Sequence, residues 1–488
     1  MALSAVMYFA SCDKQDPTGD LEGGKDNPYK PQPTVVDPDH DAKVYLRDEY
    51  MEYYYYWNEE IKSKKSKLVL SDYSIYDFFN ACLYVKDRWS WMEDGPSYIE
   101  SESGVYTGTW GVSVAQLGSD FDDYNIRVAY VYPGSPFEQF GVTRGAAMTH
   151  IGDDNVLYDI SDGKGVGKRF GSEKLEHFQT YYGGTTARFT FRLADGTDTT
   201  FTATRAQSLA TSPVLSVQVF GPGDFPGLTE KVGYFHYLSF KANFLEELDK
   251  AMNQLREAGV KKVICDFRYN GGGDSRASNL LMSYLAPAAA AGKAYVHRKH
   301  NSYLKRYDES TEVDANENRL TVDEWYFITD RSTASASEMV INGLKGLSET
   351  GGKIYMVGEQ TYGKPNGMYV LMYPGDDLSY KAYDAGDYSA LKYVFLPICF
   401  YNANYNWEYI PDEGFVPDNW QPDDLFHDFT VEEGRIKACL THIVTGSYSE
   451  PPFKKVESTK ASGAGDGALL PRPEDDPHYG TYKVLRRF

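Results

Sequence analysis

Three short apolar runs, each ending in a polar loop, constrain the fold of this chain more than any other feature. They are KKVICDF at 261–267, EWYFITD at 324–330 and KIYMVG at 353–358. The first two lead into helical patterns, and strands that alternate with helices are typical of a layered α/β unit. Because the carboxyl ends of strands in an open α/β sheet face one crevice, we expect the loops RYNGGG, RSTASAS and EQTYGKPNG to meet there.

These loops supply glycines, serines and a lysine, which together suit acyl transfer. A serine hydroxyl needs a neighbouring base, and lysine can serve when burial lowers its pKa. Glycines let backbone N–H groups face an oxyanion, and loss of one such donor typically costs roughly a hundredfold or more in rate. Each loop also has an ordinary interpretation. The serines at 332–337 can cap a helix, RYNGGG can be a tight turn, and Lys364 can be a solvated surface cation.

The segments DFRYNGGG, TASASEM and VGEQTYGK, together with their strand contexts, resemble the signature segments of the C-terminal processing peptidases, the Ser/Lys endopeptidases of the S41 class. The resemblance covers about 104–420, including VGYFHYLSF and EGFVPD. It implies a layered α/β core of the crotonase/ClpP-like kind that needs no metal or organic cofactor. It also implies that Ser335 is the nucleophile, that Lys364 is the general base, and that the backbone N–H groups of Gly272 and Ala336 bind the oxyanion.

Two departures from the family pattern concern the lysine. The interval between Ser335 and Lys364 is a few residues longer than usual, and LSETGGK at 347–353 holds the excess in a loop that can grow without moving the site. Met368 stands where many members have a glutamine that orients the lysine. Glu338 lies on the same helical face as Ser335 and is a candidate to orient Lys364 in place of that glutamine. Alternatively, Glu338 only complements the helix dipole.

Residues 104–206 carry short strand patterns separated by Gly and Asp turns. The stretch NIRVAYVYPGSPFEQFGVTRG resembles the PDZ domain that is fused to these peptidases, although Ala146 stands where an aspartate is usual. PDZ grooves add a peptide as an extra strand and hold its terminal carboxylate with loop N–H groups. The corresponding loop residues here are Gly108, Trp110, Gly111 and Val112. The alternative is a β-rich structural module that binds no ligand.

The first residues, ALSAVMYFASC, form a short apolar segment that ends in small residues and a cysteine. A segment of this size is too short to span a bilayer and fits a secretory signal. FASC resembles the lipobox of bacterial lipoproteins, which implies that Cys12 is lipidated, although no Lys or Arg precedes the apolar run. A buried N-terminal strand is the alternative.

The predicted fold class is α/β and multidomain, with a small helical domain, a PDZ-like β-rich domain and the peptidase core. The expected divisions are a signal peptide (1–12), a flexible tether (13–43), the helical domain (44–103), the PDZ-like domain (104–206), the core (207–445) and a C-terminal tail (446–488).

Composition limits the classes of molecule that this chain is expected to bind. The net charge is −21, and no Lys/Arg cluster forms a surface for nucleic acid. The five cysteines are widely spaced, so neither a disulfide framework nor a metal site is predicted.

The sequence therefore predicts an exported, lipid-anchored serine endopeptidase that cleaves unstructured C-terminal tails of polypeptides. A non-catalytic peptide-binding scaffold with the same fold remains an alternative, as does a glycan-binding lipoprotein suggested by the 41 tyrosines. The oligomeric state and the membrane face stay open.

Overall fold

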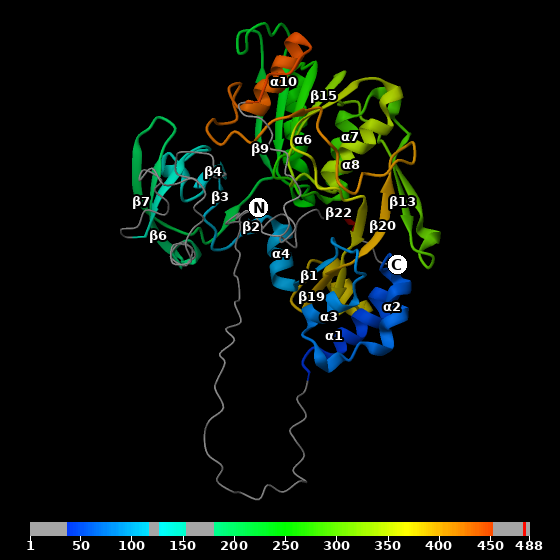
Figure 1. Ribbon diagram of the computed structural model, residues 1–488. Helices are drawn as coiled ribbons and strands as arrows, with labels where there is room; N and C mark the ends of the chain where they lie inside the picture. The colour runs from blue at the N-terminus through cyan, green and yellow to red at the C-terminus, as the bar shows by residue number, and fades with distance from the viewer. Residues whose placement is uncertain (1–36, 117–125, 153–179, 452–481, 485–488) are drawn as a thin grey trace, which may run out of the picture.

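The computed structural model describes residues 37–116, 126–152, 180–451 and 482–484. The predicted signal peptide with Cys12, most of the tether and most of the C-terminal tail lie outside the described residues. The described part forms a mixed α/β structure with several sheets, as the sequence predicts (Figure 1).

A six-stranded sheet forms the centre of the predicted core (207–445), in the order β21-β16-β15-β11-β10-β9. Its strands are β9 (Val214–Phe220), β10 (Val232–Tyr237), β11 (Lys262–Asp266), β15 (Glu324–Thr329), β16 (Lys353–Gly358) and β21 (Asn419–Trp420). All neighbours are parallel except β9, which is an antiparallel edge strand. The apolar runs of β11 and β15 are buried on both faces, as parallel strands covered by helices require.

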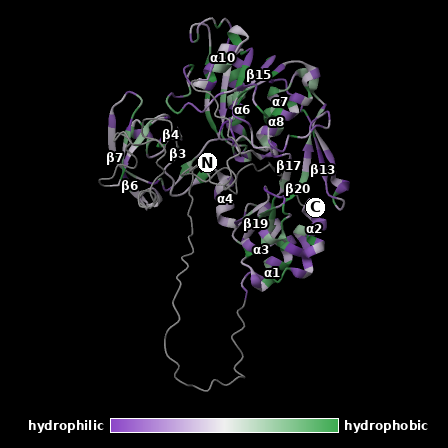
Figure 2. Cartoon of the chain, viewed as in Figure 1, coloured by the Kyte–Doolittle hydropathy of each residue, from purple (hydrophilic) through white to green (hydrophobic). Residues whose placement is uncertain are grey.

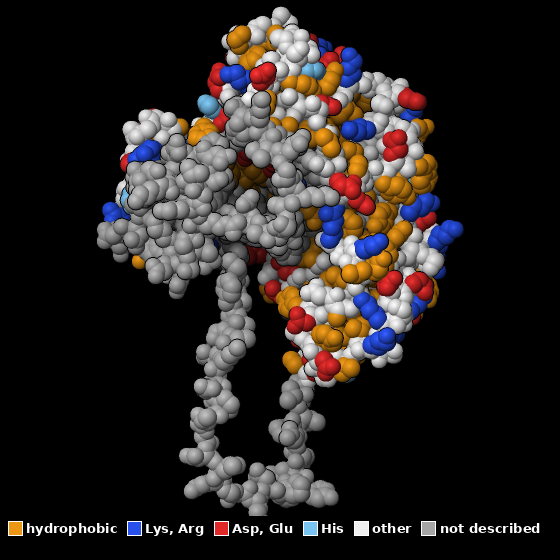
Figure 3. Space-filling view, viewed as in Figure 1, with side chains coloured by type: hydrophobic (Ala, Val, Ile, Leu, Met, Phe, Trp, Pro, Cys, Tyr) orange, Lys and Arg blue, Asp and Glu red, His pale blue; other side chains and the backbone are white. Residues whose placement is uncertain are grey.

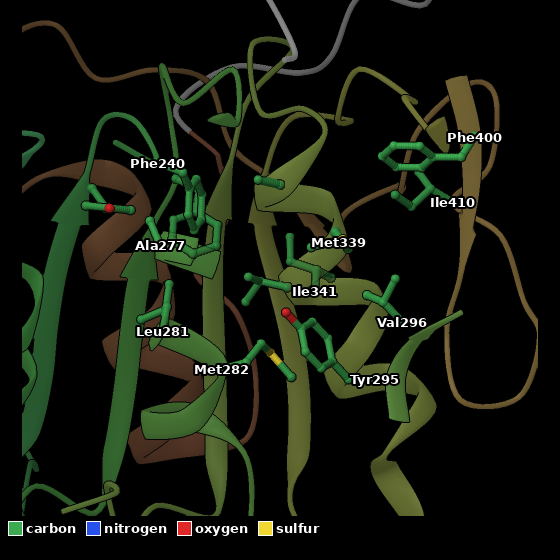
Figure 4. Packing of buried hydrophobic residues seen from close by; sticks show 14 of the residues in the cluster. Phe240, Ala277, Leu281, Met282, Tyr295, Val296, Met339, Ile341, Phe400 and Ile410 are labelled. Atoms are coloured by element: carbon green, nitrogen blue, oxygen red, sulfur yellow. The ribbon is translucent and has the colours of Figure 1, made fainter. Parts of the chain in front are cut away.

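Helices cover both faces of this sheet. They are α6 (Leu245–Ala258), α7 (Ser275–Leu285), α8 (Ala336–Gly346) and α10 (Gly434–Thr445). Residues of α6, α7 and α8 share one buried cluster with Phe235 and Phe327, whereas α10 shares another with Tyr234 and Tyr326. Because adjacent strand residues point to opposite faces, the two clusters mark the two sides of the sheet. Figure 4 shows the first of these layers, and the mixture of hydrophobic and hydrophilic residues along its helices is visible in Figure 2.

A second sheet has the order β12-β22-β17-β20-β13-β14. Its strands are β12 (Gly273–Asp274), β13 (Ala294–His300), β14 (Glu309–Glu312), β17 (Asn366–Tyr369), β20 (Ile398–Ala403) and β22 (Tyr482–Val484). The side chains of Val296 and Phe400 belong to the same buried cluster as Ile341 of α8 (Figure 4). The loop after β16 therefore passes from the first sheet to the second, and Lys364 lies at the end of that passage.

Residues 37–104 are mainly helical, but they do not form a self-contained helical unit. Their helices are α1 (His40–Tyr45), the π-helix η1 (Leu46–Tyr54), α2 (Asn58–Lys64), α3 (Ile75–Cys82) and α4 (Gly95–Ser103). The region also contains a strand that was not predicted, β1 (Trp91–Asp94). It pairs with β19 (Tyr393–Leu396), which is itself paired with β18 (Leu371–Tyr373). A run of four residues has too little periodicity to reveal a strand whose partner lies about 300 residues away.

Short elements complete these regions. They are α9 (Asp377–Asp384) and the 3₁₀ turns η2 (Lys65–Lys67), η3 (Leu70–Asp72), η4 (Glu138–Phe140), η5 (Ala242–Phe244), η6 (Ala288–Ala290), η7 (Lys305–Tyr307) and η8 (Ser348–Thr350).

A separate antiparallel sheet, β3-β4-β5-β6-β7, lies beside the core (Figure 1). Its strands are β3 (Val112–Gln116), β4 (Ile126–Val131), β5 (Ala147–Ile151), β6 (Thr186–Arg192) and β7 (Asp198–Thr204), and the two-stranded β2 (Val105–Tyr106) and β8 (Leu209–Ala210) lie at its connections. Alternate residues of β6 are buried in an aromatic cluster with Phe137 and Phe201. At β6 one face of the sheet is therefore packed and the other faces solvent, whereas β4 is buried on both faces.

Two surface properties bear on the expected partners. None of the helices in the described ranges is long and apolar enough to cross a membrane. On the face drawn in Figure 3, Lys and Arg side chains are interspersed with Asp and Glu.

Candidate active site

The loops after β11, β15 and β16 contact one another. The three strands are parallel neighbours, so their carboxyl ends lie at one edge of the sheet. The Thr333 hydroxyl donates a hydrogen bond to the Phe267 carbonyl at 2.8 Å. The Ala334 N–H donates to the Asn270 carbonyl, and the Tyr362 N–H donates to the Thr333 carbonyl. The glycine, serine and lysine loops thus form one assembly.

Ser335 lies at the N-cap of α8 in a strained backbone conformation. Its φ is 55° and its ψ is −110°, in a region that residues with a side chain rarely adopt. The side chain is 1% exposed, and its Oγ has no hydrogen-bond partner among the residues that the structure describes. Buried hydroxyls are nearly always paired, so an unpaired one in a strained turn is a candidate functional group.

Glu338 connects the backbone of Ser335 to that of Lys364. Its Oε2 accepts hydrogen bonds from the N–H groups of Ser335 and Lys364, each at 2.9 Å. Its Oε1 accepts from the Thr361 hydroxyl at 2.6 Å and from the Gly363 N–H at 2.7 Å. Burial raises the pKa of the Glu338 carboxyl above its usual range, against the lowering effect of these hydrogen bonds. The carboxylate therefore sets the position of the serine loop relative to the lysine loop.

Lys364 is buried, and its amine lies beside a thioether. The Lys364 Nζ is 3.7 Å from the Met368 Sδ, and the side chain is 1% exposed. Because the Ser335 Oγ has no partner among the described residues, it is not hydrogen-bonded to this amine. The N-terminal region supports the loop from outside, since an Arg88 guanidinium nitrogen donates to the Gly363 carbonyl at 3.1 Å.

Gly272 packs directly against Ser335. A Cβ at Gly272, whose φ is 102°, would lie 2.8 Å from the Ser335 Cβ and 2.9 Å from the Ala336 nitrogen. Only glycine fits this approach. The Gly272 N–H donates to the Asn270 Oδ1 at 2.9 Å, so it is occupied in this structure. Ala336 is the first residue of α8, where helix geometry leaves the N–H without an intrahelical acceptor.

Sequence reasoning missed several polar residues that hold these loops. The Asn270 side chain donates to the Tyr237 carbonyl at 2.7 Å while its Oδ1 accepts from Gly272. The Asp330 carboxylate accepts from the N–H groups of Ser332 and Tyr269. An Asn before a glycine run and an Asp at a strand end are available turn-forming signals for both.

Asn366 was also missed. It stands two residues after Lys364 at the start of β17, opposite Tyr401 of β20. Its carboxamide is fully buried, and neither polar atom has a hydrogen-bond partner within the described ranges. No pattern in the sequence distinguishes this asparagine from a turn residue.

A buried ionic cluster lies beneath the glycine loop. Arg268 contacts Glu433 at 2.6 Å and Asp266 at 2.8 Å. Arg144, from the turn before β5, contacts Asp423 at 2.7 Å and donates to the Tyr269 hydroxyl at 3.0 Å. Although burial acts in the opposite direction, the guanidinium groups of Arg144, Arg435 and Arg268 hold the pKa of Asp423 well below its usual range.

Tyr269 connects that cluster to the loop. Its φ is 67°, it directly precedes Asn270, and its hydroxyl donates to Asp423. The five-stranded sheet and the glycine loop are therefore joined through buried charges.

The four residues expected to bind a terminal carboxylate lie around the turn before β3. The Gly108 N–H donates to the Ala206 carbonyl at 2.8 Å, and the Gly111 N–H donates to the Thr109 hydroxyl at 3.1 Å. Trp110 is buried in the aromatic cluster with its indole N–H on the Tyr182 carbonyl. Val112 begins β3 opposite Val131. The N–H groups of both glycines thus already have protein acceptors.

Possible metal ligands are scattered. Within the described ranges, no group of three or more His, Cys, Asp or Glu residues could hold a metal ion. Cys82, Cys265, Cys399 and Cys439 are buried free thiols.

Comparison with known proteins shows what the part of the chain that carries this site is similar to. Residues 231–390 match the model of peptidase family S41, and this range includes Gly272, Ser335 and Lys364. A carboxyl-terminal-processing protease of Picosynechococcus sp. is 27% identical over 242 residues, which are 49% of this chain and 50% of that protein. A protein of the same name from Synechocystis sp. is 30% identical over 165 residues, 34% of each chain. The chain thus aligns with at most half the length of these curated relatives.

A solved structure from Bacteroides fragilis, provisionally assigned as an S41 protease, has the same fold. It is 18% identical with a TM-score of 0.60, and the match covers 82% of this chain and 96% of that one. The resemblance inferred from the three loop segments is thereby confirmed. Residues 231–390 of this chain are therefore similar to peptidase family S41.

Proposed function

We propose that this chain is a serine endopeptidase with Ser335 as nucleophile and Lys364 as general base. The Lys364 amine takes the proton of the Ser335 hydroxyl as the oxygen attacks the scissile carbonyl. The same amine then protonates the leaving nitrogen, and water hydrolyses the acyl-enzyme. The observation that carries the proposal is the buried Glu338 carboxylate, which holds the backbone N–H groups of both residues at 2.9 Å.

The Lys364 side chain must reorient for this reaction. Its amine lies at the Met368 sulfur, which is a weak acceptor. The loop backbone is already fixed by Glu338, so rotation about side-chain bonds is the motion required. Such rotations are fast compared with turnover of a typical peptidase.

The oxyanion is held by the N–H of Ala336 together with one from the glycine segment. Close packing of Gly272 on Ser335 supports this arrangement. The Gly272 N–H serves as the second donor if a small peptide rotation releases it from Asn270. Of the two donors, the Ala336 N–H is the one that stabilises the developing charge without reorganisation.

The substrates are unstructured ends of exported polypeptides, and the five-stranded sheet acts as a PDZ-like module that captures them. The name of the relatives, carboxyl-terminal-processing protease, supports this substrate class. The loop at Gly108, Trp110, Gly111 and Val112 is the proposed carboxylate site. The proposed location is the cell envelope, with lipidation at Cys12 as the anchor.

Hydrolysis of an unfolded test polypeptide by purified protein tests the proposal. Ser335→Ala and Lys364→Ala are expected to abolish it, whereas Ser348→Ala and Lys353→Ala, at exposed positions, keep wild-type rates. Retained hydrolysis in either of the first two variants would overturn the mechanism.

A non-catalytic peptide-binding protein is the second candidate. The lack of a hydrogen bond to the Ser335 Oγ among the described residues favours it. A fluorophosphonate probe separates the two candidates. Covalent labelling of wild type and not of Ser335→Ala supports the peptidase, while peptide binding without labelling supports the scaffold.

A further inference from the structure

The strand β22 lies in an unusual place. Tyr482–Val484 is inserted between β12 and β17 and runs parallel to both. Tyr482 is opposite Gly273 and Lys483 is opposite Asp274 on one side. On the other side, Lys483 is opposite Met368 and Val484 is opposite Tyr369. Among the strands that the structure describes, β22 is the one that connects β12 to β17 in this sheet.

We call the space between β12 and β17, which β22 fills, the slot. Both of its edges belong to the candidate active site. On one edge, Gly273 directly follows Gly272, the residue that packs against Ser335. On the other edge, Met368 is the residue beside the Lys364 amine. A strand in the slot therefore runs between the segment that contacts the nucleophile and the strand that contacts the base.

The slot suits any extended polypeptide. Strand edges present rows of backbone N–H and C=O groups, and an added strand pairs with them whatever its sequence. Pairing on two edges holds the backbone of the added strand straight and leaves its side chains to the two faces of the sheet.

We propose that the slot between β12 and β17 is where the peptidase holds its substrate as an added strand, and that Tyr482–Val484 occupies it in competition with substrate. The slot itself is a backbone-binding site, and only the kinetic consequence rests on the proposed function. A tethered segment competes at an effective concentration of roughly millimolar. Added substrate must displace it, so occupancy by the chain's own strand raises the KM and leaves the kcat unchanged.

Lys483→Pro in the full chain tests the competition. Proline removes the backbone N–H and is excluded from the middle of a sheet. The expected result is a KM for an unfolded polypeptide that is lower by about tenfold or more at unchanged kcat, given the effective concentration of the tethered strand. Lys460→Pro is the matched control in the same tail, and its KM stays at the wild-type value. An equal KM in Lys483→Pro and wild type would overturn the proposal.

A binding measurement keeps the test independent of catalysis. A fluorescent peptide with the sequence of residues 478–488 is titrated into full-length Ser335→Ala protein, with and without Lys483→Pro. We expect saturable binding that is at least tenfold tighter when the slot is vacated by Lys483→Pro, and no binding of a peptide that itself carries proline at the position of Lys483. Equal affinities, or no binding to the Lys483→Pro protein, would refute the slot.

The two measurements separate the two proposals. If the peptide binds as expected but the protein never hydrolyses a substrate, the peptidase function is refuted and the slot is supported. If hydrolysis depends on Ser335 but Lys483→Pro changes neither the KM nor the peptide affinity, the slot is refuted and the peptidase function is supported.

Discussion

Glu338 accepts hydrogen bonds from the backbone N–H groups of Ser335 and Lys364 with the same oxygen, at 2.9 Å each. The two residues are far apart in sequence, and the carboxylate brings their loops together beneath the reacting side chains. Glu338 therefore acts on Lys364 through its backbone rather than through its amine. It is a positioning residue for the proposed reaction.

Replacing Glu338 by glutamine tests this role. The carboxamide places an N–H₂ group where two N–H donors need an acceptor, so about 2–3 kcal/mol of unfolding free energy is expected to be lost. A displacement of the loops by about 1 Å is expected to lower kcat/KM by roughly a hundredfold. Urea unfolding and hydrolysis of an unfolded polypeptide measure both. Glu349→Gln, at an exposed position, is the control, and equal behaviour of the two variants would contradict the assignment.

Gly272 offers a test of the oxyanion loop. In Gly272→Ala, the new Cβ would lie 2.8 Å from the Ser335 Cβ at a φ of 102°. Displacement of the serine and its N–H donors is expected to lower kcat roughly a hundredfold to a thousandfold. Gly292→Ala is the matched control, because its φ of 76° imposes similar strain with no atom within 4 Å of the new Cβ. If both variants lose activity equally, backbone strain alone explains the effect.

The convergence of the loops follows from the sequence, whereas their contacts do not. The runs of β11 and β15 are apolar on both faces, which predicts parallel strands, and parallel strands bring their carboxyl ends together. The partners of Glu338 are Thr361 and Gly363, and no local pattern specifies a carboxylate contact with another loop. The place of the Lys364 amine at Met368 depends on side-chain rotamers, which sequence patterns do not encode.

Residues 37–104 and the proposed oxyanion donor show the same limit. Helix α3 is amphipathic and begins with the Ser74 cap, so it was predictable. The pairing of β1 with β19 and the bond from the Gly272 N–H to Asn270 arise only when distant segments or specific turns are in place.

The Arg144–Asp423 pair joins the five-stranded sheet to the core, and its removal is expected to destabilise both. The Arg144 side chain is 1% exposed, so Arg144→Met leaves the partly buried Asp423 and the buried Glu433 with fewer partners. We expect a loss on the order of 3 kcal/mol in unfolding free energy. Arg192→Met removes a pair whose side chains are 43% and 49% exposed, for which about 1 kcal/mol or less is expected. Urea denaturation of both variants checks the difference, and similar losses would contradict a structural role for the buried pair.

His236 makes the stability of the core depend on pH. Burial lowers the pKa of His236 to about 4 from 6.5, because the charged imidazole loses its hydration in the core. Below pH 6.5 the His236 imidazole is protonated in the unfolded chain, whereas in the folded chain it stays neutral until the pH approaches 4. The stabilisation is therefore complete above pH 6.5 and is lost as the pH falls towards 4, in total roughly 3 kcal/mol.

The variant His236→Phe removes this titration and is expected to flatten the dependence of unfolding free energy on pH between 6.5 and 4. The ring of Phe429 lies 4.5 Å from the imidazole centroid, so an aromatic replacement has a packing partner. His427→Asn serves as the control, because the His427 side chain is 55% exposed, and it is expected to keep the wild-type slope. Urea titrations at several pH values give the slopes. A slope unchanged in His236→Phe would mean that buried carboxylates, and not this imidazole, set the acid sensitivity of the core.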